Sequence, residues 1–163
     1  MNDLDPLNEA DIGRAVTHAL QKCGAQPGPL LEILHAVQDE LGHVPAAAVP
    51  LLADALNLSR AEVHGVVSFY HHFRGAPPGG TVVRLCRAEA CQAMNARALE
   101  EHATRTLGVP CGATTADGRV TLEAVYCLGN CACAPSMMVN GELHGRVTPA
   151  RFDELAREWN GVS

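Results

Sequence analysis

Two close pairs of cysteines in the second half of the chain limit its fold more than any other feature. The first pair, Cys86 and Cys91, has four residues between its members, and the second pair, Cys127 and Cys131, has three. Each pair follows an apolar segment typical of a β-strand, within "TVVRLC" and "RVTLEAVYC". Loops that follow the strands of an α/β sheet tend to lie at one edge, so we expect the two pairs to converge there.

Three chemistries are open to such thiols: a disulfide, a metal site or a redox-active dithiol. The N-terminus, "MNDLDPLNEA", lacks the basic and apolar regions of a secretion signal, and the chain has no apolar run long enough to span a membrane. We therefore expect a cytoplasmic protein, and disulfides are rare in that compartment. The chain has no Cys-x-x-Cys pair, which thioredoxin-type redox chemistry requires. Metal binding is therefore favoured.

Four thiolates from two loops bind either zinc or an iron–sulfur cluster. Structural zinc sites usually have two residues between paired ligands, so the wider gaps here favour two irons that each take two thiolates. Gly129 supports this interpretation, because a glycine between ligands lets backbone N–H groups approach sulfur closely. Arg84 and Arg87 lie beside the first pair, and they either lie in solvent or offset the negative charge of a cluster.

The remaining cysteines are given other roles. Cys23 and Cys111 are isolated in the sequence, and we expect both to be packed as small apolar residues. Cys133, in "CAC", is either a packed thiol near the cluster or a substitute ligand. Several histidines lie among aromatic residues near the end of an apolar helix, where packing or domain contacts are favoured over a second metal site. These histidines are His64, His71 and His72.

The two halves of the chain differ in their apolar periodicity. Residues 1–75 contain four helical patterns, of which the first three end near Gly24, Gly42 and Asn57. The fourth begins at Ser59 with the capping-box sequence "SRAE". The stretch "RGAPPGG" that follows is typical of a linker, which predicts a helical N-terminal domain that ends before it.

Residues 80–163 alternate strands and helices in the order β-α-β-β-α. One helix is expected over "CQAMNARALEEHATRTLG", and the next strand should bury every second residue from Val120 to Tyr126. Asn140-Gly141 predicts a tight hairpin turn, and Thr148 is the expected N-cap of the last helix. The predicted fold class is therefore α+β: an N-terminal helical bundle, followed by an α/β domain with a small mixed sheet that is similar to thioredoxin-like domains.

Composition excludes several functions. The formal net charge of −6 argues against a nucleic-acid partner, which would favour a basic surface. No nucleophile with a neighbouring base, phosphate-binding glycine loop or pair of carboxylates in a plausible pocket is found. We therefore expect no catalytic residues on this chain, and the cysteines are its only visible reactive groups.

The cysteine motifs resemble those of a known family. "CRAEAC", "YCLGNC" and "VNGELHGRVTP", together with "LLEILHAVQDELGHVP" and "LNLSRAEVHGVVSFYHHF", are similar to the 24-kDa-type subunit of respiratory NADH dehydrogenases. The resemblance implies a thioredoxin-like [2Fe-2S] ferredoxin domain behind a helical N-terminal domain. It also implies that one [2Fe-2S] cluster is bound by four ligands: Cys86, Cys91, Cys127 and Cys131.

Within that family, "CRAEACQAM" and "GNCACAP" look most like the gamma subunit of a soluble, molybdenum-dependent, NAD-linked formate dehydrogenase. This resemblance implies a direct partner, a beta subunit that carries FMN and binds NAD, and an alpha subunit that carries the molybdenum cofactor. The chain would then exchange single electrons with the flavin subunit. The equivalent subunit of complex I or of an NAD-reducing hydrogenase is the alternative. A zinc-stapled interaction protein and a free-standing ferredoxin or redox sensor stay open as well.

Overall fold

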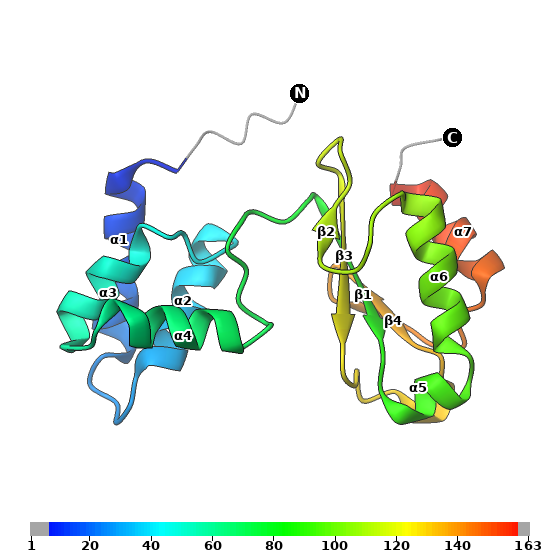
Figure 1. Ribbon diagram of the computed structural model, residues 1–163, viewed down its shortest axis with the longest axis horizontal. Helices are drawn as coiled ribbons and strands as arrows, with labels where there is room; N and C mark the ends of the chain where they lie inside the picture. The colour runs from blue at the N-terminus through cyan, green and yellow to red at the C-terminus, as the bar shows by residue number, and fades with distance from the viewer. Residues whose placement is uncertain (1–6, 160–163) are drawn as a thin grey trace. The chain divides into compact units, whose positions relative to one another are not determined.

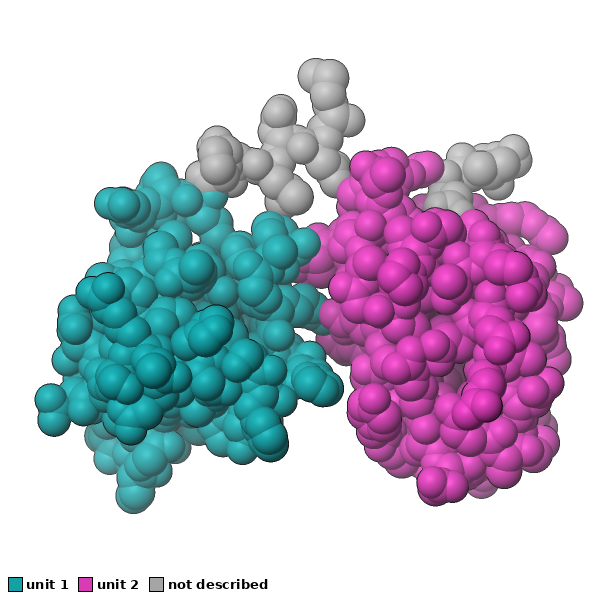
Figure 2. Space-filling model, in the orientation of Figure 1, with its two compact units in different colours: residues 1–77 teal, residues 78–163 magenta. Residues whose placement is uncertain are grey.

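The computed structural model describes residues 7–159, and the chain divides into two compact units, Met1–Pro77 and Pro78–Ser163. Figure 2 colours the two units separately. The division falls within the "RGAPPGG" stretch. The first and last residues of the chain lie outside the described part, and the expected domains, residues 1–75 and 80–163, stay a prediction.

Unit 1 (Met1–Pro77) is helical, as the sequence predicts. Its helices are α1 (Glu9–Cys23), α2 (Leu30–Leu41), α3 (Ala48–Leu56) and α4 (Arg60–Phe69). The predicted capping box is present at the start of α4, where the backbone N–H of Ser59 donates to Glu62 Oε2 at 2.7 Å and the Ser59 side chain accepts from the Glu62 N–H. Gly42 ends α2 in the left-handed conformation, with a φ of 77°, which glycine adopts without strain.

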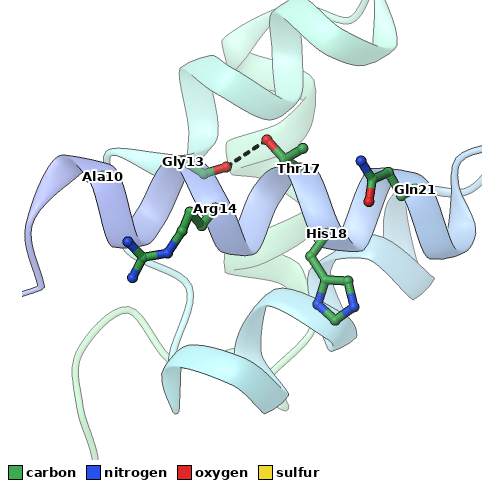
Figure 3. Close-up of a pocket in the computed structure, with 6 residues that line it drawn as sticks. All are labelled: Ala10, Gly13, Arg14, Thr17, His18 and Gln21. Atoms are coloured by element: carbon green, nitrogen blue, oxygen red, sulfur yellow. Dashed lines mark hydrogen bonds between the residues drawn. The ribbon is translucent and has the colours of Figure 1, made fainter.

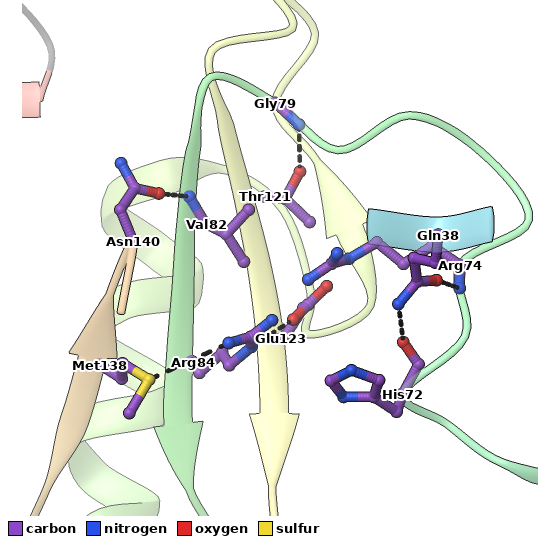
Figure 4. Close-up of polar contacts among 10 residues, drawn as sticks. All are labelled: Gln38, His72, Arg74, Gly79, Val82, Arg84, Thr121, Glu123, Met138 and Asn140. Atoms are coloured by element: carbon purple, nitrogen blue, oxygen red, sulfur yellow. Dashed lines mark hydrogen bonds and ion pairs between the residues drawn. The ribbon is translucent and has the colours of Figure 1, made fainter. Parts of the chain in front are cut away.

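The core of unit 1 lies between its helices and includes one buried polar side chain. Ile33, Leu34 and Leu52 are fully buried there. The amide of Gln38 donates to the His72 carbonyl at 2.9 Å and accepts from the Arg74 N–H at 2.7 Å (Figure 4). Because both ends of this buried amide are hydrogen-bonded, it fixes the segment that follows α4 without leaving a polar group unsatisfied.

Unit 2 (Pro78–Ser163) contains a mixed sheet, which confirms the predicted fold class. In the described part of the chain the strand order is β2-β3-β1-β4-β5, and only β1 and β3 pair in parallel. The strands are β1 (Thr81–Cys86), β2 (Ala113–Thr114), β3 (Val120–Val125), β4 (Met137–Val139) and β5 (Glu142–His144). The helical elements are α5 (Glu89–Ala93), α6 (Ala96–Leu107), the 3-10 helix η1 (Cys131–Cys133) and α7 (Pro149–Trp159).

The two faces of the sheet differ. Helices α6 and α7 pack against one another and lie beside one face in Figure 1, where Leu122 of the sheet and Phe152 of α7 are fully buried. Side chains alternate along a strand, so Arg84, which lies between Val83 and Leu85 of the core, points to the other face. There Arg84 Nε pairs with Glu123 Oε2 across β1 and β3 at 2.9 Å, beside Met138 of β4 (Figure 4).

Some predicted elements differ from those observed. The helix expected over "CQAMNARALEEHATRTLG" is two helices, because Asn95 adopts a φ of 67° and ends the helical geometry between α5 and α6. Strand β3 ends at Val125 and its first three residues are all buried, so the alternation predicted from Val120 to Tyr126 is wrong; Tyr126 is 69% exposed. Strand β2 has only two residues and no periodic pattern to predict it. No helix within residues 7–159 has the length and apolar character needed to cross a membrane.

Candidate metal centre

The first pair lies on regular structure in the core of unit 2. Cys86 is the last residue of β1 and Cys91 lies within α5, and their exposed fractions are only 4% and 2%. Buried alanines of the neighbouring segments pack around both thiols. The Arg87 N–H donates to the Val125 carbonyl at 2.7 Å, which joins the chain after β1 to the last residue of β3. The end of β1, which carries Cys86, is therefore fixed to the end of β3.

The second pair lies on the irregular segment that follows β3. Cys127 and Cys131 are both exposed, and their Sγ atoms lie 3.7 Å apart. The Gly129 N–H donates to Cys127 Sγ at 3.3 Å, as the glycine between these cysteines led us to expect. Gly129 has a φ of 75°, a conformation that a residue with a side chain adopts only with strain.

Cys127 itself has an unusual backbone conformation. Its φ is 126°, in a region that residues other than glycine rarely adopt. Such a conformation costs about 1–3 kcal/mol and is found mainly where the surrounding structure imposes it, often at functional sites. The chain therefore holds this cysteine against its local preference, on an exposed turn where packing offers no reason for it.

The two pairs converge at the edge of the sheet where β1 and β3 end. Burial raises the pKa of the Cys91 thiol, and the nearby thiols of Cys86 and Cys131 act in the same direction. A hydrogen bond with Cys127 raises the pKa of Cys131, and the charge on Cys86 adds to this effect. The Cys86, Cys91 and Cys131 thiols thus influence one another, and Cys127 lies beside Cys131, although within the described residues no three of these thiols are grouped around a single ion position. Binding of an iron centre would release protons from them, because thiolates are the metal-binding form.

Ser136 connects the segments of the two pairs, and nothing in the sequence led us to expect it. Its side chain is 2% exposed, and its hydroxyl donates to the carbonyls of Asn130 and Cys133 at 3.3 Å each. Its carbonyl accepts from the Cys86 N–H at 3.1 Å, and its backbone acts to lower the pKa of the Cys91 thiol, against the larger effect of burial. No periodicity or motif marks this serine, because its partners are fixed only by the fold.

The two arginines beside the first pair are engaged by carboxylates. Arg87 Nε donates to Glu100 Oε2 at 2.7 Å, and Arg84 pairs with Glu123 on the sheet. Neither arginine lies freely in solvent, and the charge of each is already offset by a carboxylate. Cluster charge compensation, one of the two roles considered for them, therefore has no support from these contacts.

The other cysteines lie apart from the four-thiol edge or at its margin. Cys23 is buried in the core of unit 1, and Cys111 is partly buried against the core of unit 2, which confirms that both are packed. Burial raises the pKa of the Cys111 thiol. Cys133 is the last residue of η1 and is partly buried.

The histidines of unit 1 form no visible site. His64, His71 and His72 are all exposed, so burial does not support the packing interpretation, although the ring centroid of His72 lies 5.1 Å from that of His35. Within residues 7–159, no three histidine, cysteine or acidic side chains are grouped so as to hold one metal ion. A shallow hollow of about 480 Å³ runs along α1 (Figure 3) and is lined by Ala10, Gly13, Arg14, Thr17, His18 and Gln21. All of these residues come from a single helix, which makes the hollow an open surface groove.

Comparisons with known proteins agree with this geometry. The model of the thioredoxin-like [2Fe-2S] ferredoxin family matches residues 16–160. A subunit of the NADH-quinone oxidoreductase of Pseudomonas aeruginosa is 37% identical over 119 residues, which cover 73% of this chain and 72% of the relative. NADP-reducing hydrogenase subunit HndA of Solidesulfovibrio fructosivorans is 31% identical, with 90% of this chain and 85% of the relative covered. The NADH-quinone oxidoreductase subunit of the same kind from Escherichia coli is 32% identical over 145 residues, which cover 89% of this chain and 87% of the relative.

A solved structure shares the fold. The crystal structure of an NAD+-reducing [NiFe]-hydrogenase in the air-oxidized state matches 81% of this chain, with a TM-score of 0.67 and 28% identity. This chain spans only about a quarter of that hydrogenase chain, 23% of its length. The family implies a [2Fe-2S] cluster, and four free thiols that converge from two pairs are a suitable donor set for one. The chain belongs to the thioredoxin-like [2Fe-2S] ferredoxin family.

Proposed function

We propose that this chain is a one-electron transfer subunit of an NAD(P)-linked oxidoreductase complex, and that its four converging cysteines hold one [2Fe-2S] cluster. The observation that carries the proposal is the meeting of the two cysteine pairs where the parallel strands β1 and β3 end. The family match and the relatives, which are subunits of redox complexes, support it.

The two cysteine pairs would have different roles: the first would shield the cluster from water, and the second would expose it to a partner. When bound, such a cluster accepts and releases one electron at a time. The first pair is surrounded by apolar side chains, which keep water from one side of the centre. The second pair is exposed and lies beside Tyr126, so a redox centre of a partner could approach from that side. The N–H of Gly129 points at Cys127 Sγ, and bonds of this kind stabilise negative charge that is added to sulfur.

The relatives favour a complex of the NADH-quinone oxidoreductase kind or of the NAD(P)-reducing hydrogenase kind. In either assembly we propose that the direct partner is a subunit that binds a flavin and NAD. A flavin passes on, one at a time, the two electrons that it receives as a hydride, and this chain would take them singly. FMN and NAD would then lie on the partner, and the whole assembly would work in the cytoplasm.

A molybdenum-dependent formate dehydrogenase is the second candidate. The segments "CRAEACQAM" and "GNCACAP" support it, because their wording around the cysteines resembles the gamma subunit of that enzyme. In that assembly an alpha subunit with the molybdenum cofactor would complete the complex. The relatives reported above belong to other complexes, so this candidate depends on those short segments alone.

Metal analysis of the chain, purified anaerobically with its partner proteins, tests the proposal. About two irons and two acid-labile sulfides per chain are expected for one [2Fe-2S] cluster. Zinc without iron would contradict the cluster and favour a zinc-stapled interaction protein. The subunits that copurify then decide between the candidate complexes. NAD reduction driven by formate identifies the formate dehydrogenase, whereas hydrogen-driven NAD(P) reduction or NADH-driven quinone reduction identifies the others.

A further inference from the structure

The turn that carries Cys131 is held in place by two residues that are not cysteines. We infer that Ser136 and Gly145 are positioning residues of the metal centre, which fix the cysteine turn (residues 130–135) against the first pair. The inference rests on the proposed function, because it concerns the cluster that the four thiols would hold. Neither residue is a ligand, and each acts through the backbone of the cysteine turn.

Ser136 holds the cysteine turn from its C-terminal side. Its buried hydroxyl bonds to two carbonyls of the turn, those of Asn130 and Cys133. Its own carbonyl accepts from the Cys86 N–H, so this residue links the turn to the first pair. If the hydroxyl is removed, the two carbonyls lose a donor while the backbone bonds of Ser136 remain possible. The change therefore loosens the turn without removing a thiol.

Gly145 packs directly against the cysteine turn, and the contact is so close that position 145 has no room for a side chain. A Cβ atom at position 145 would lie 2.7 Å from Cys133 Cβ and 3.0 Å from the Cys133 carbonyl oxygen. It would also lie 2.7 Å from Asn130 Nδ2, but that side chain can move aside, whereas the Cys133 atoms move only with the turn itself. Gly145 is not among the residues with a positive φ, so the requirement for glycine is steric.

The residues after Gly145 bond directly to the same turn. The Arg146 N–H donates to the Cys133 carbonyl at 2.6 Å, and the Val147 N–H donates to the Pro135 carbonyl at 3.0 Å. The Cys133 carbonyl thus accepts from both Ser136 and Arg146, which locks its orientation. Val147 is 1% exposed and belongs to the core of unit 2, so this contact anchors the turn to the rigid part of the unit.

The position of this turn should set the properties of the centre. Reduction adds negative charge to the sulfurs of a cluster, and fixed backbone N–H groups near those sulfurs stabilise that charge. A loosened or displaced turn offers this stabilisation less well. Both Ser136→Ala and Gly145→Ala are therefore expected to make the midpoint potential more negative and to change the g values of the reduced cluster, with the bound iron retained.

A redox titration of the purified full-length chain, followed by electron paramagnetic resonance, tests the inference. Gly79→Ala is the matched control, because a Cβ there would lie 2.8 Å from the Arg119 backbone carbon, at the far end of β1 from the thiols. The control is expected to lower the melting temperature as Gly145→Ala does, while the wild-type potential and g values are kept.

The outcomes separate this inference from the function on which it rests. A wild-type potential and wild-type g values in both Ser136→Ala and Gly145→Ala would overturn it, because the residues would then be structural only. If Gly145→Ala does not fold, Ser136→Ala decides the question alone. A wild-type chain that holds no iron would overturn the proposed function itself, and this inference with it.

Discussion

The sheet of unit 2 is built differently at its two ends. At the cysteine end, where β1 and β3 finish, the chain continues into irregular turns with exposed thiols. Cys127 and Cys131 lie there, and Cys127 keeps a φ of 126° that its residue type disfavours. Tyr126 and Met94 add exposed apolar surface next to the thiols in sequence, with exposed fractions of 69% and 58%. The strained backbone at this end lowers the stability of the fold, and packing alone does not require it.

At the turn end, where β1 and β3 begin, the polar groups satisfy one another. Asp117 accepts from the Thr115 hydroxyl at 2.5 Å and from the Arg119 N–H at 3.1 Å. The Gly79 N–H donates to the Thr121 hydroxyl oxygen at 2.6 Å (Figure 4). These contacts close the turn before β3 and fasten the start of β1 to it. The turn end therefore stabilises the sheet and offers no reactive group.

The difference between the two ends shows where reactive side chains are found in a unit with parallel strands. Parallel strands place the segments that follow them at one edge of the sheet, so reactive side chains gather there. In this chain the pairing of Cys86 with Val125 brings the end of β1 level with the end of β3, two residues before Cys127. Substitutions at the cysteine end should thus affect the metal centre, and those at the turn end should affect stability alone.

The largest effect is expected when a thiol of the second pair is removed. Cys127→Ser or Cys131→Ser should abolish most of the visible absorption of the purified protein, because a cluster of this kind needs four thiolate ligands. Cys23→Ser, in the core of unit 1, is the control and should keep the absorption. Full absorption and wild-type iron content in both variants of the second pair would remove these cysteines from the site.

The sequence predicted the elements whose signals are local. The capping box of α4, the end of α2 at Gly42 and the hairpin at Asn140-Gly141 each depend on a few neighbouring residues. Asn140 and Gly141 have φ values of 48° and 92°, which fit the tight turn that this dipeptide favours. Thr148 also caps α7 as predicted, because its hydroxyl accepts from the Arg151 N–H at 3.2 Å.

The features that escaped prediction depend on residues far apart in the chain. The break at Asn95 interrupts a good helical pattern, and it separates α6 from α5, which packs beside η1. Gly145 touches the cysteine turn across more than ten residues of chain, and nothing in its neighbours reveals the contact. The cysteine pairs themselves were visible because ligand spacing is a local pattern, whereas the support around them is not.

A smaller effect is expected on the free energy of unfolding of the iron-free chain, where the two cysteine pairs should differ. Cys91 is 2% exposed, so Cys91→Ser places a hydroxyl in an apolar cluster and should lower the free energy of unfolding by about 1–3 kcal/mol. Cys131→Ser is the matched control, since an exposed substitution should change this free energy by no more than about 0.5 kcal/mol. Urea unfolding of the iron-free variants measures both. Equal losses would show that the second pair is as much part of the core as the first.

The smallest effect is expected at the turn end and depends on pH. Hydrogen bonds from Thr115 and Arg119 lower the pKa of Asp117 to about 2 in the folded chain, below the value of about 3.9 in an unfolded one. A lowered pKa stabilises the fold at every pH above the unfolded value, and this contribution disappears as the pH falls through the folded value. Asp117→Asn should therefore lower the melting temperature at neutral pH, and the difference from wild type should shrink between about pH 4 and pH 2.

Glu101→Gln, an exposed change on α6, is the control. A difference for Asp117→Asn that stays constant down to pH 2 would show that the asparagine disturbs the turn by its shape, and that the charge of Asp117 adds nothing to this end of the sheet.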